Sequence, residues 1–289
     1  MNTQSATWET NEYYRVQMTT AEFDQLSHFI YNELGIKMPD VKRIMLQSRL
    51  QKRLSELKMR SFKEYIEFVF SKEGRNDELI TMIDLVTTNK TDFFRESSHF
   101  DFMTETALPE ILSSRTATGP VKIWSAGCSS GEEPYTIAIA VEEYIRNNRR
   151  FDYEIFATDL STRILERATT AVYSEDRIAG LSYDLKKRYF LKSRDPKNHT
   201  VRVAPEIRSR VSFQRLNFMD AQYPVDNNFD IVFCRNVLIY FDRDTQQDVI
   251  TKLASRLKND GFFFLGHSES ITNMNVPLRQ VKPTIFRRI

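Results

Sequence analysis

The sequence predicts an α/β protein, in which a doubly wound, Rossmann-like domain with a small inserted β-subdomain follows an all-α N-terminal domain. Three observations predict this fold class. Apolar residues recur at helical spacing through residues 19–90. Buried strands then alternate with helices through residues 121–289, which is typical of a mainly parallel sheet. A turn-rich segment at about residues 173–210 interrupts this alternation and predicts the inserted subdomain.

Composition and charge indicate a globular protein of the cytoplasm. The 289 residues are 41% hydrophobic and 28% charged, with a formal net charge of +2. No apolar run approaches the length of about 18 residues that a membrane span needs, and the N-terminus lacks the pattern of an export signal. Only Cys128 and Cys234 are present, as expected in a reducing compartment. The four histidines show no metal-ligand spacing, so no metal is expected.

The N-terminal domain is expected to contain helices only. Residues 1–18 are polar and aperiodic and predict a flexible tail. Thr19 followed by Glu22 predicts the start of a first helix, which Gly35 ends. Residues 61–70 and 77–88 predict two later helices, and residues 91–120 a linker helix and hinge. The second helix, after Pro39, is expected to bury Val41, Ile44, Leu50, Leu54 and Leu57.

The elements of the Rossmann-like domain follow from the hydrophobic pattern. Apolar runs predict strands at residues 121–126, 153–159, 211–217, 229–236 and 261–269. Amphipathic runs predict helices at residues 132–148, 161–172 and 243–258. Within the inserted segment, residues 182–191 predict a helix and residues 200–204 a strand. Ligands of doubly wound sheets bind at the carboxyl ends of the strands, so the residues that follow each strand are the candidate site.

The turn after the first strand has the layout of a phosphate-binding loop but the wrong charge. In "IWSAGCSSGEEPYTIAI", Glu132 and Glu133 stand where phosphate binders carry Gly-Lys-Ser/Thr. Asp159 ends the next strand, at the position where dinucleotide folds hold ribose hydroxyls. S-adenosylmethionine (SAM), with a ribose, a sulfonium and an ammonium, fits these acids, whereas the pyrophosphate of NAD would be repelled. Glu132 is equally explained as an acid that caps its helix.

The residues after the fourth strand, in "FDIVFCRNVLIYF", suit an anionic methyl acceptor. Methyltransferases that act on amino groups of DNA carry an Asn/Asp-Pro-Pro-aromatic turn here, whereas this chain has Arg235, Asn236 and then Tyr240. A glutamate carboxylate, with a pKa of about 4.3, is ionised at neutral pH and needs alignment rather than a general base. The residues alone also allow a purely structural reading, in which Tyr240 packs and Arg235 pairs with an acid.

Six stretches together resemble the chemotaxis receptor glutamate O-methyltransferases of the CheR type. They are "TTNKTDFFRE", "IWSAGCSSGEEPYTIAI", "FATDLS", "LNF", "FCRNVLIYF" and "GHSES", in the order of the family. The resemblance implies an N-terminal helical domain and a SAM-dependent methyltransferase domain with an inserted antiparallel β-subdomain. It also implies that methyl groups pass from SAM to glutamates of chemoreceptors, which leaves S-adenosylhomocysteine and the glutamate methyl esters used in sensory adaptation.

The resemblance also implies the site residues. It places SAM contacts at Asn89, Thr91, Arg95, Glu133, Asp159, Asn217, Phe218, Arg235 and Asn236. Arg95 would clasp the methionyl carboxylate, Asp159 would accept from the ribose hydroxyls, and Glu133 would lie near the cationic groups. Asn217 and Phe218 would hold the adenine. Tyr240, with Arg95 as a helper, would orient the acceptor glutamate, whereas Phe93 and Phe94 are expected in the core.

Partners are expected at two surfaces. Basic residues share one side of the second helix: Lys42, Arg49, Arg53 and Arg60. Such a run is either a solvated face or a docking face; the resemblance favours a receptor helical bundle over nucleic acid, for which no binding motif is present. In many members of the family the inserted subdomain binds a receptor C-terminal peptide by strand addition. Here the corresponding loop, residues 192–198, lacks glycine, and Trp8-Glu9-Thr10 resembles that peptide by chance.

Two other functions remain open from the sequence. One is a nucleic-acid or small-molecule methyltransferase on the same fold, and the other is a module that senses SAM without turnover. A monomer that is not inserted in a membrane is expected in each case.

Overall fold

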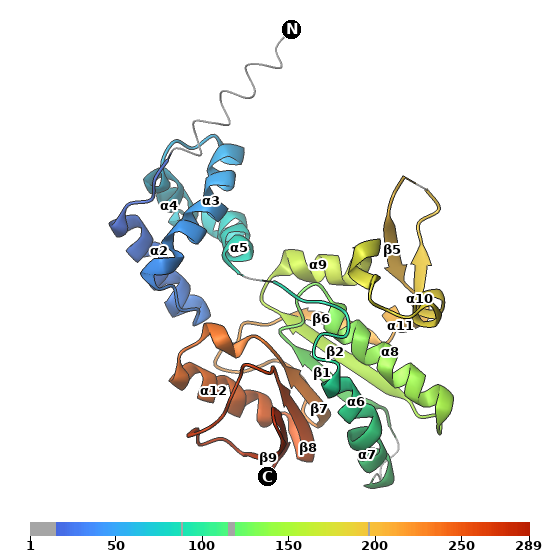
Figure 1. Ribbon diagram of the computed structural model, residues 1–289. Helices are drawn as coiled ribbons and strands as arrows, with labels where there is room; N and C mark the ends of the chain where they lie inside the picture. The colour runs from blue at the N-terminus through green and yellow to red at the C-terminus, as the bar shows by residue number, and fades with distance from the viewer. Residues whose placement is uncertain (1–15, 88, 115–118, 196) are drawn as a thin grey trace. The chain divides into compact units, whose positions relative to one another are not determined.

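The computed structural model describes residues 16–87, 89–114, 119–195 and 197–289, which form two compact units divided between residues 88 and 89 (Figure 1). Most of the expected tail, with Trp8-Glu9-Thr10, lies outside the described residues, as do residues 115–118 of the expected hinge and Pro196 of the insert loop. Residues 16–18 already pack on the helical unit: Met18 is buried, and its N–H donates to Gln47 Oε1 over 2.9 Å. None of the helices in the described part of the chain combines the length and apolar character that a membrane crossing needs.

The first unit is all helical. It contains α2 (Thr20–Leu34), the 3₁₀ turn η1 (Asp40–Lys42), α3 (Arg43–Leu57), α4 (Phe62–Phe70) and α5 (Gly74–Val86). The predicted start of α2 is confirmed, because Thr19 and Glu22 form a reciprocal capping box. Gly35 ends the helix in the left-handed conformation, at φ 69°.

The predicted core face of α3 is wrong at its N-terminal end. Val41 and Ile44 are 87% and 77% exposed, whereas Leu46, Leu50 and Leu54 are fully buried. Ile44 precedes Leu46 by two residues, which is about 200° around a helix, so it lies on the opposite side. The buried face is therefore set by the spacing of four residues that begins at Leu46.

The second unit begins with a helical segment that belongs to its core. This segment contains α6 (Ser98–Phe102), the π-helical turn η2 (Met103–Ala107) and α7 (Leu108–Ser114). Phe100, Met103 and Leu108 are buried with side chains of the sheet and of α8 (Glu132–Asn147). As far as residue 114, the expected linker is thus a layer of the second unit.

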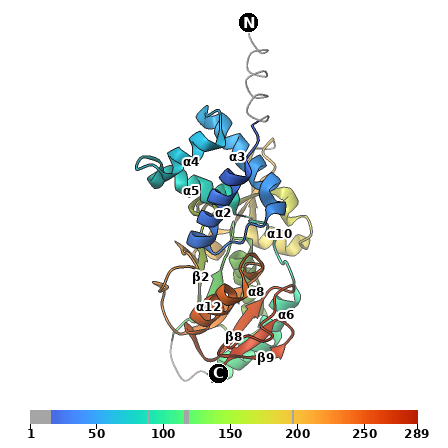
Figure 2. The ribbon, with the colours of Figure 1, turned by 90° about the vertical axis from the view of Figure 1, so that its left-hand side faces the viewer.

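A seven-stranded sheet forms the centre of the second unit, in the order β6-β2-β1-β7-β8-β10-β9. Its strands are β1 (Val121–Ala126), β2 (Tyr153–Asp159), β6 (Val211–Arg215), β7 (Phe229–Cys234), β8 (Leu257–Leu265), β9 (Leu278–Lys282) and β10 (Ile285–Arg288). The five predicted strands run parallel, and β10 and β9 add antiparallel at one edge. The helices α6 and α8 cover one face, and α12 (Arg243–Ala254) covers the other (Figures 1 and 2). The helix α9 (Thr162–Thr170) packs against β2 and β6.

The inserted subdomain is a three-stranded antiparallel sheet in the order β3-β5-β4. It contains β3 (Val172–Ser174), η3 (Glu175–Ile178), α10 (Tyr183–Tyr189), β4 (Phe190–Lys192) and β5 (Thr200–Val203), with α11 (Pro205–Arg208) after it. The sequence predicted α10 and β5 but assigned Phe190 and Leu191 of β4, and Val172 of β3, to helices. Phe93 packs edge-on against Tyr173 and Phe190, so this sheet shares a core with the segment that precedes α6.

Candidate active site

The predicted acids lie together at the carboxyl ends of β1, β2 and β7, because these three strands are neighbours in the sheet, with β1 in the middle. Asp159, at the end of β2, accepts from the backbone N–H groups of Ser129 (2.8 Å) and Ser161 (3.1 Å). Glu133, in the first turn of α8, accepts from the Ser125 hydroxyl over 2.7 Å. Residues of β1 and of the turn that follows it therefore hold both acids in place.

Arg235, which directly follows β7, is a buried cation held between two carboxylates. Its side chain is 2% exposed, and its guanidinium lies 3.0 Å from Glu96 Oε2 and 3.3 Å from Glu133 Oε2. It also donates to the backbone carbonyl of Arg95. A buried guanidinium is stable only when it is paired and hydrogen-bonded in this way. Arg235 therefore shares the strand ends with three acids, Glu96, Glu133 and Asp159.

The environment moves the pKa values of the two glutamates in opposite directions. Burial acts to raise the pKa of Glu96, but hydrogen bonds from Asn236 and the charge of Arg235 hold that pKa below its ordinary value. Burial raises the pKa of Glu133 despite Arg235 and the Ser125 hydroxyl. Glu133 is thus the acid that would gain most from a further positive charge.

Strained backbone gathers around these groups. Four residues that are not glycine have left-handed φ values between 50° and 60°: Phe94, Glu96, Ser129 and Asn236. Gly127 has φ 84°, and a Cβ there would lie 2.5 Å from Val237 Cγ2. Such conformations are disfavoured and concentrate at functional sites, so these strand ends are the strongest candidate site in the described chain.

The segment that carries the "TTNKTDFFRE" motif is tied to the Gly-rich turn by Arg177. This arginine lies in η3 of the inserted subdomain, and it binds Asp92 (2.9 Å), Glu132 (2.5 Å) and the Thr91 carbonyl. Glu132 also accepts from the Ser130 hydroxyl, and no side chain caps α8. Glu132 lies in the first turn of α8, where an acid suits the helix dipole, and it is also the ion-pair partner of Arg177. Nothing in the sequence near Arg177 indicates this role.

Glu269 is a second site residue to which the sequence assigned no role. It is buried, and it accepts from the backbone N–H groups of Asn236 (2.9 Å), Leu238 (2.8 Å) and Gly266 (2.7 Å). It thereby joins the end of β8 to the loop that positions Arg235. The "GHSES" motif contains this residue, but only the fold brings it to that loop.

The remaining predicted residues lie around the same strand ends. Arg95 is half-buried and donates to the Lys90 carbonyl over 2.9 Å. The Asn89 carbonyl accepts from the Ser129 hydroxyl (3.0 Å), and Asn217 Oδ1 accepts from the Met219 N–H (3.0 Å).

The two aromatic candidates lie after β6 and β7. Phe218 is buried against Tyr223 and Phe241. Tyr240 is half-buried in the short turn η4 (Leu238–Tyr240).

The basic side of α3 is partly used within the helical unit. Arg49 donates to the carbonyls of Leu85, Val86 and Thr87 at the end of α5, over 2.7–3.3 Å. Arg53 pairs with the buried Glu78 (2.6 Å) and with Glu56 (2.8 Å). Arg60 is exposed, and Lys42, which is half-exposed, donates to the Lys37 carbonyl.

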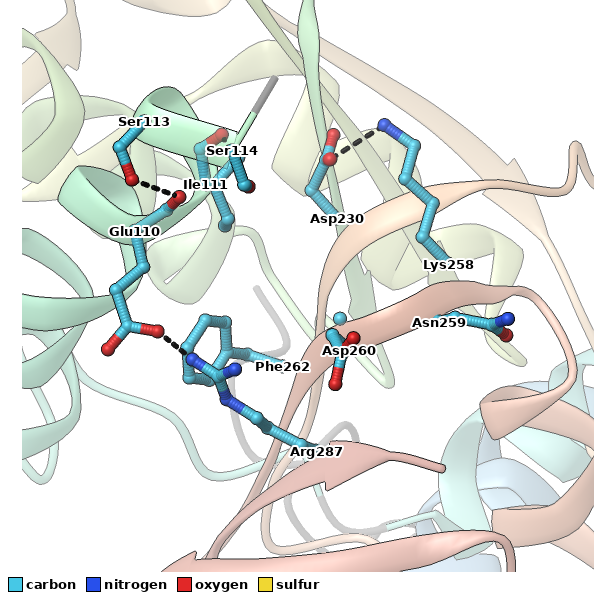
Figure 3. Close-up of a pocket in the computed structure, with 11 residues that line it drawn as sticks. Glu110, Ile111, Ser113, Ser114, Asp230, Lys258, Asn259, Asp260, Phe262 and Arg287 are labelled. Carbon is cyan, nitrogen blue, oxygen red and sulfur yellow. Dashed lines mark hydrogen bonds and ion pairs between the residues drawn. The ribbon is translucent and has the colours of Figure 1, made fainter. Parts of the chain in front are cut away.

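A cavity of about 640 Å³ lies toward the other end of the central strands, away from their carboxyl ends (Figure 3). Four of its charged side chains pair with one another: Glu110 binds Arg287, and Asp230 binds Lys258 over 2.6 Å. Doubly wound folds bind ligands at the carboxyl ends of the strands, so this cavity is not the candidate active site.

Comparison with known proteins agrees with the geometry. The family model for the CheR methyltransferase, SAM binding domain, matches residues 89–286, and the model for the CheR methyltransferase, all-alpha domain, matches residues 21–87. The chemotaxis protein methyltransferase of Borreliella burgdorferi is 40% identical over 276 residues, which cover 94% of this chain and 96% of that relative. The Escherichia coli protein of the same name is 36% identical and covers 90% of this chain and 88% of its own.

Solved structures that match include a phosphoethanolamine N-methyltransferase of Haemonchus contortus in complex with phosphoethanolamine and S-adenosylhomocysteine. It is 16% identical, with a TM-score of 0.33, over 75% of this chain and 39% of its own. The two family models together span most of the described residues of both units. This chain belongs to the CheR methyltransferase family, with its all-α domain followed by a SAM-binding methyltransferase domain.

Proposed function

We propose that this protein transfers the methyl group of SAM to glutamate side chains of chemoreceptor cytoplasmic domains, forming methyl esters and S-adenosylhomocysteine. The observation that carries the proposal is the buried Arg235, held between Glu96 and Glu133 at the carboxyl edge of the sheet. An edge with more acids than cations suits a cofactor that has a sulfonium and an ammonium and lacks phosphate. The family of the chain supports the same reaction.

The donor set fits SAM. Each carboxylate oxygen of Asp159 accepts one backbone N–H, and a carboxylate is also the acceptor that ribose hydroxyls need. Glu133 would lie near the positive groups, and Arg95 would bind the methionyl carboxylate. Phe218 and Asn217 would hold the adenine. The contacts assigned to Asn89, Thr91, Arg235 and Asn236 complete this proposal.

The acceptor needs orientation rather than activation. When bound, SAM supplies an electrophilic methyl group on its sulfonium. A glutamate carboxylate is already ionised at neutral pH, with an ordinary pKa of about 4.3, so no side chain has to remove a proton. The task of Tyr240 and Arg95 is to hold one carboxylate oxygen in line with the methyl carbon and to exclude water.

The helical unit supplies a docking surface. Arg60 is the exposed member of the basic set, and Lys42 is half-exposed between the exposed apolar residues Val41 and Ile44. A negatively charged receptor bundle would be steered by such a surface. We also propose that the protein acts as a cytoplasmic monomer recruited to receptor arrays, and that its insert binds a receptor C-terminal peptide.

The test is methyl transfer from labelled SAM to a chemoreceptor cytoplasmic fragment, followed by mild alkali. Release of the label as methanol identifies a carboxyl ester, as expected. A label that resists alkali would mean N- or S-methylation and would overturn the acceptor assignment. No transfer, together with tight binding of S-adenosylhomocysteine, would favour the sensing module instead.

A further inference from the structure

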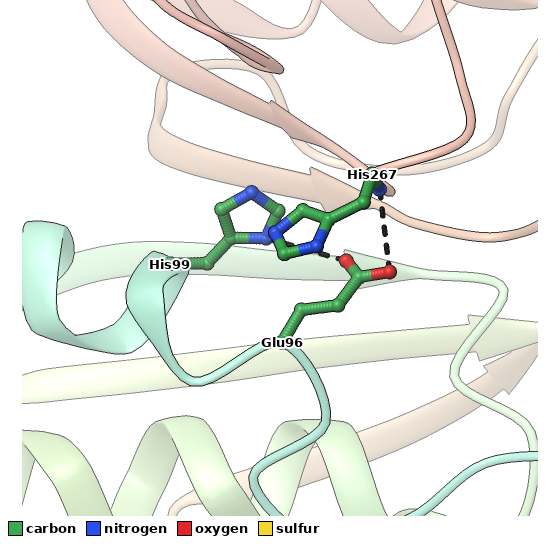
Figure 4. Close-up of side chains that lie close together, drawn as sticks. All are labelled: Glu96, His99 and His267. Carbon is green, nitrogen blue, oxygen red and sulfur yellow. Dashed lines mark hydrogen bonds and ion pairs between the residues drawn. The ribbon is translucent and has the colours of Figure 1, made fainter.

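Two histidines that are far apart in the sequence meet beside Glu96 (Figure 4). His99 lies in α6, and His267 follows β8. One ligand atom from each of Glu96, His99 and His267 lies within 4.8 Å of the other two. Figure 4 shows ring nitrogens of both histidines turned toward the Glu96 carboxylate.

The tautomer of His99 leaves a buried lone pair facing that carboxylate. The Thr284 hydroxyl donates to the Pro283 carbonyl over 2.7 Å, so it can only accept from His99 Nε2, 2.9 Å away. Nε2 therefore carries the ring proton, and Nδ1 carries a lone pair. Nδ1 has no hydrogen-bond partner, and it lies 3.6 Å from Glu96 Oε2 on a side chain that is 2% exposed.

Glu96 Oε2 pairs with Arg235, but the buried His99 Nδ1 that faces it has no donor, so a cation between the two atoms would satisfy this nitrogen as well. The separation of 3.6 Å is close to the distance of about 3.3 Å between neighbouring ligand atoms of a tetrahedral zinc ion. Thr284 would hold the ring of His99 in place, as outer-shell partners of metal-bound histidines do.

An ion can reach this place from solvent. A cavity of about 450 Å³ adjoins the cluster and is lined by His99, His267 and the acids Asp101 and Glu105, with Lys282 on its wall. His267 is exposed, and its Nε2 lies 3.4 Å from the Ser98 hydroxyl, a contact weak enough to yield to a metal.

We propose that Glu96, His99 and His267 form a binding site for a divalent transition metal such as zinc. The site has three protein ligands and an open fourth position. Glu96 Oε2 would turn from Arg235 to the metal, while Asn236 Nδ2 (3.1 Å) and the His267 N–H (3.2 Å) still hold Oε1. Because Arg235 and the metal compete for Glu96 Oε2, we expect the metal to bind reversibly and to inhibit methyl transfer rather than to stabilise the fold.

Metal binding would then act on the cofactor. Arg235 would keep Glu133 but lose Glu96, so saturating zinc is expected to weaken binding of S-adenosylhomocysteine, and the product to weaken zinc binding by the same factor. This coupling rests on the proposed cofactor site, whereas the metal site itself does not.

The test is calorimetric titration of the metal-free full chain with zinc, and with cobalt followed by absorption. One ion per chain is expected. H267A should weaken binding by roughly tenfold or more, H267C should retain it, and H199A, which changes an exposed histidine of the insert, should leave it unchanged.

Absence of saturable binding, or equal binding by wild type and H267A, would refute the site. Product titrations with and without zinc test the coupling separately. An unchanged product affinity at saturating zinc would refute the coupling alone. A failure of methyl transfer would refute the proposed function without affecting the metal titration.

Discussion

Arg235 is the residue on which the candidate site depends most, because one planar guanidinium reaches Glu96, Glu133 and the Arg95 carbonyl. Lysine keeps the charge but has a single ammonium and cannot span both acids. We expect R235K to lower the free energy of unfolding by about 2–4 kcal/mol and to weaken binding of S-adenosylhomocysteine. Urea unfolding and calorimetry measure these effects, with R279K on the exposed face of β9 as the control. Wild-type behaviour of R235K would show that charge alone suffices.

Glu133 gives a prediction about pH. Its pKa is raised in the folded protein, so its contribution to stability is present below the unfolded pKa of about 4.5 and is lost as pH rises through the folded value. E133Q cannot ionise. Without ligand, the melting temperature of E133Q relative to wild type should therefore rise between pH 4.5 and pH 7. A difference that stays constant or falls with pH would show that Arg235 outweighs burial.

A substitution at Asp159 is expected to affect cofactor binding more than folding. It is half-exposed, and asparagine can still accept one of the two backbone N–H groups that hold it. D159N is expected to weaken cofactor binding by roughly tenfold, since one charge-assisted hydrogen bond is worth about 1.5–3 kcal/mol. D244N, an exposed acid at the start of α12, is the control. Equal product affinities by calorimetry would remove Asp159 from the site.

The helix α3 shows how a basic side divides into structural and exposed members. Glu78 is buried and accepts from Arg53 and from the Tyr65 hydroxyl over 2.9 Å. R53A would leave this carboxylate without its cation and should destabilise the helical unit by about 3–5 kcal/mol. R60A, which changes an exposed arginine beyond the C-terminal end of α3, should leave thermal unfolding unchanged. If both variants melt like wild type, Arg53 is no more structural than Arg60.

Elements with a strong local pattern could be predicted from the sequence, and those fixed by distant partners could not. The capping box at the start of α2 and the five parallel strands can each be recognised from residues that are adjacent in the sequence. β9 buries little beyond Leu278, so its sequence carries no strand pattern. The same division holds at the site. Glu133 and Asp159 follow predicted strands, whereas Arg177, Glu269 and the pair His99–His267 acquire their partners only when distant segments meet.

At the scale of the whole molecule, the proposed reaction requires the helical unit to recognise the receptor and the second unit to bind the cofactor. Attraction between exposed charges is screened by salt, with a Debye length that falls from about 10 Å at 0.1 M to about 3 Å at 1 M. Interactions with partly buried groups at the strand ends, such as Arg235 and Glu133, are screened far less. Raising the salt concentration should therefore increase KM for a receptor fragment while kcat and KM for SAM change little.

In the double variant K42A/R60A, KM for the fragment should already be high at low salt and should respond less to added salt. Steady-state kinetics across a salt series, with the double variant R149A/R150A, which changes two exposed arginines after α8, as the control, measures both effects. If K42A/R60A and wild type respond to salt alike, the basic side of α3 does not steer the receptor, and the docking surface must be sought elsewhere.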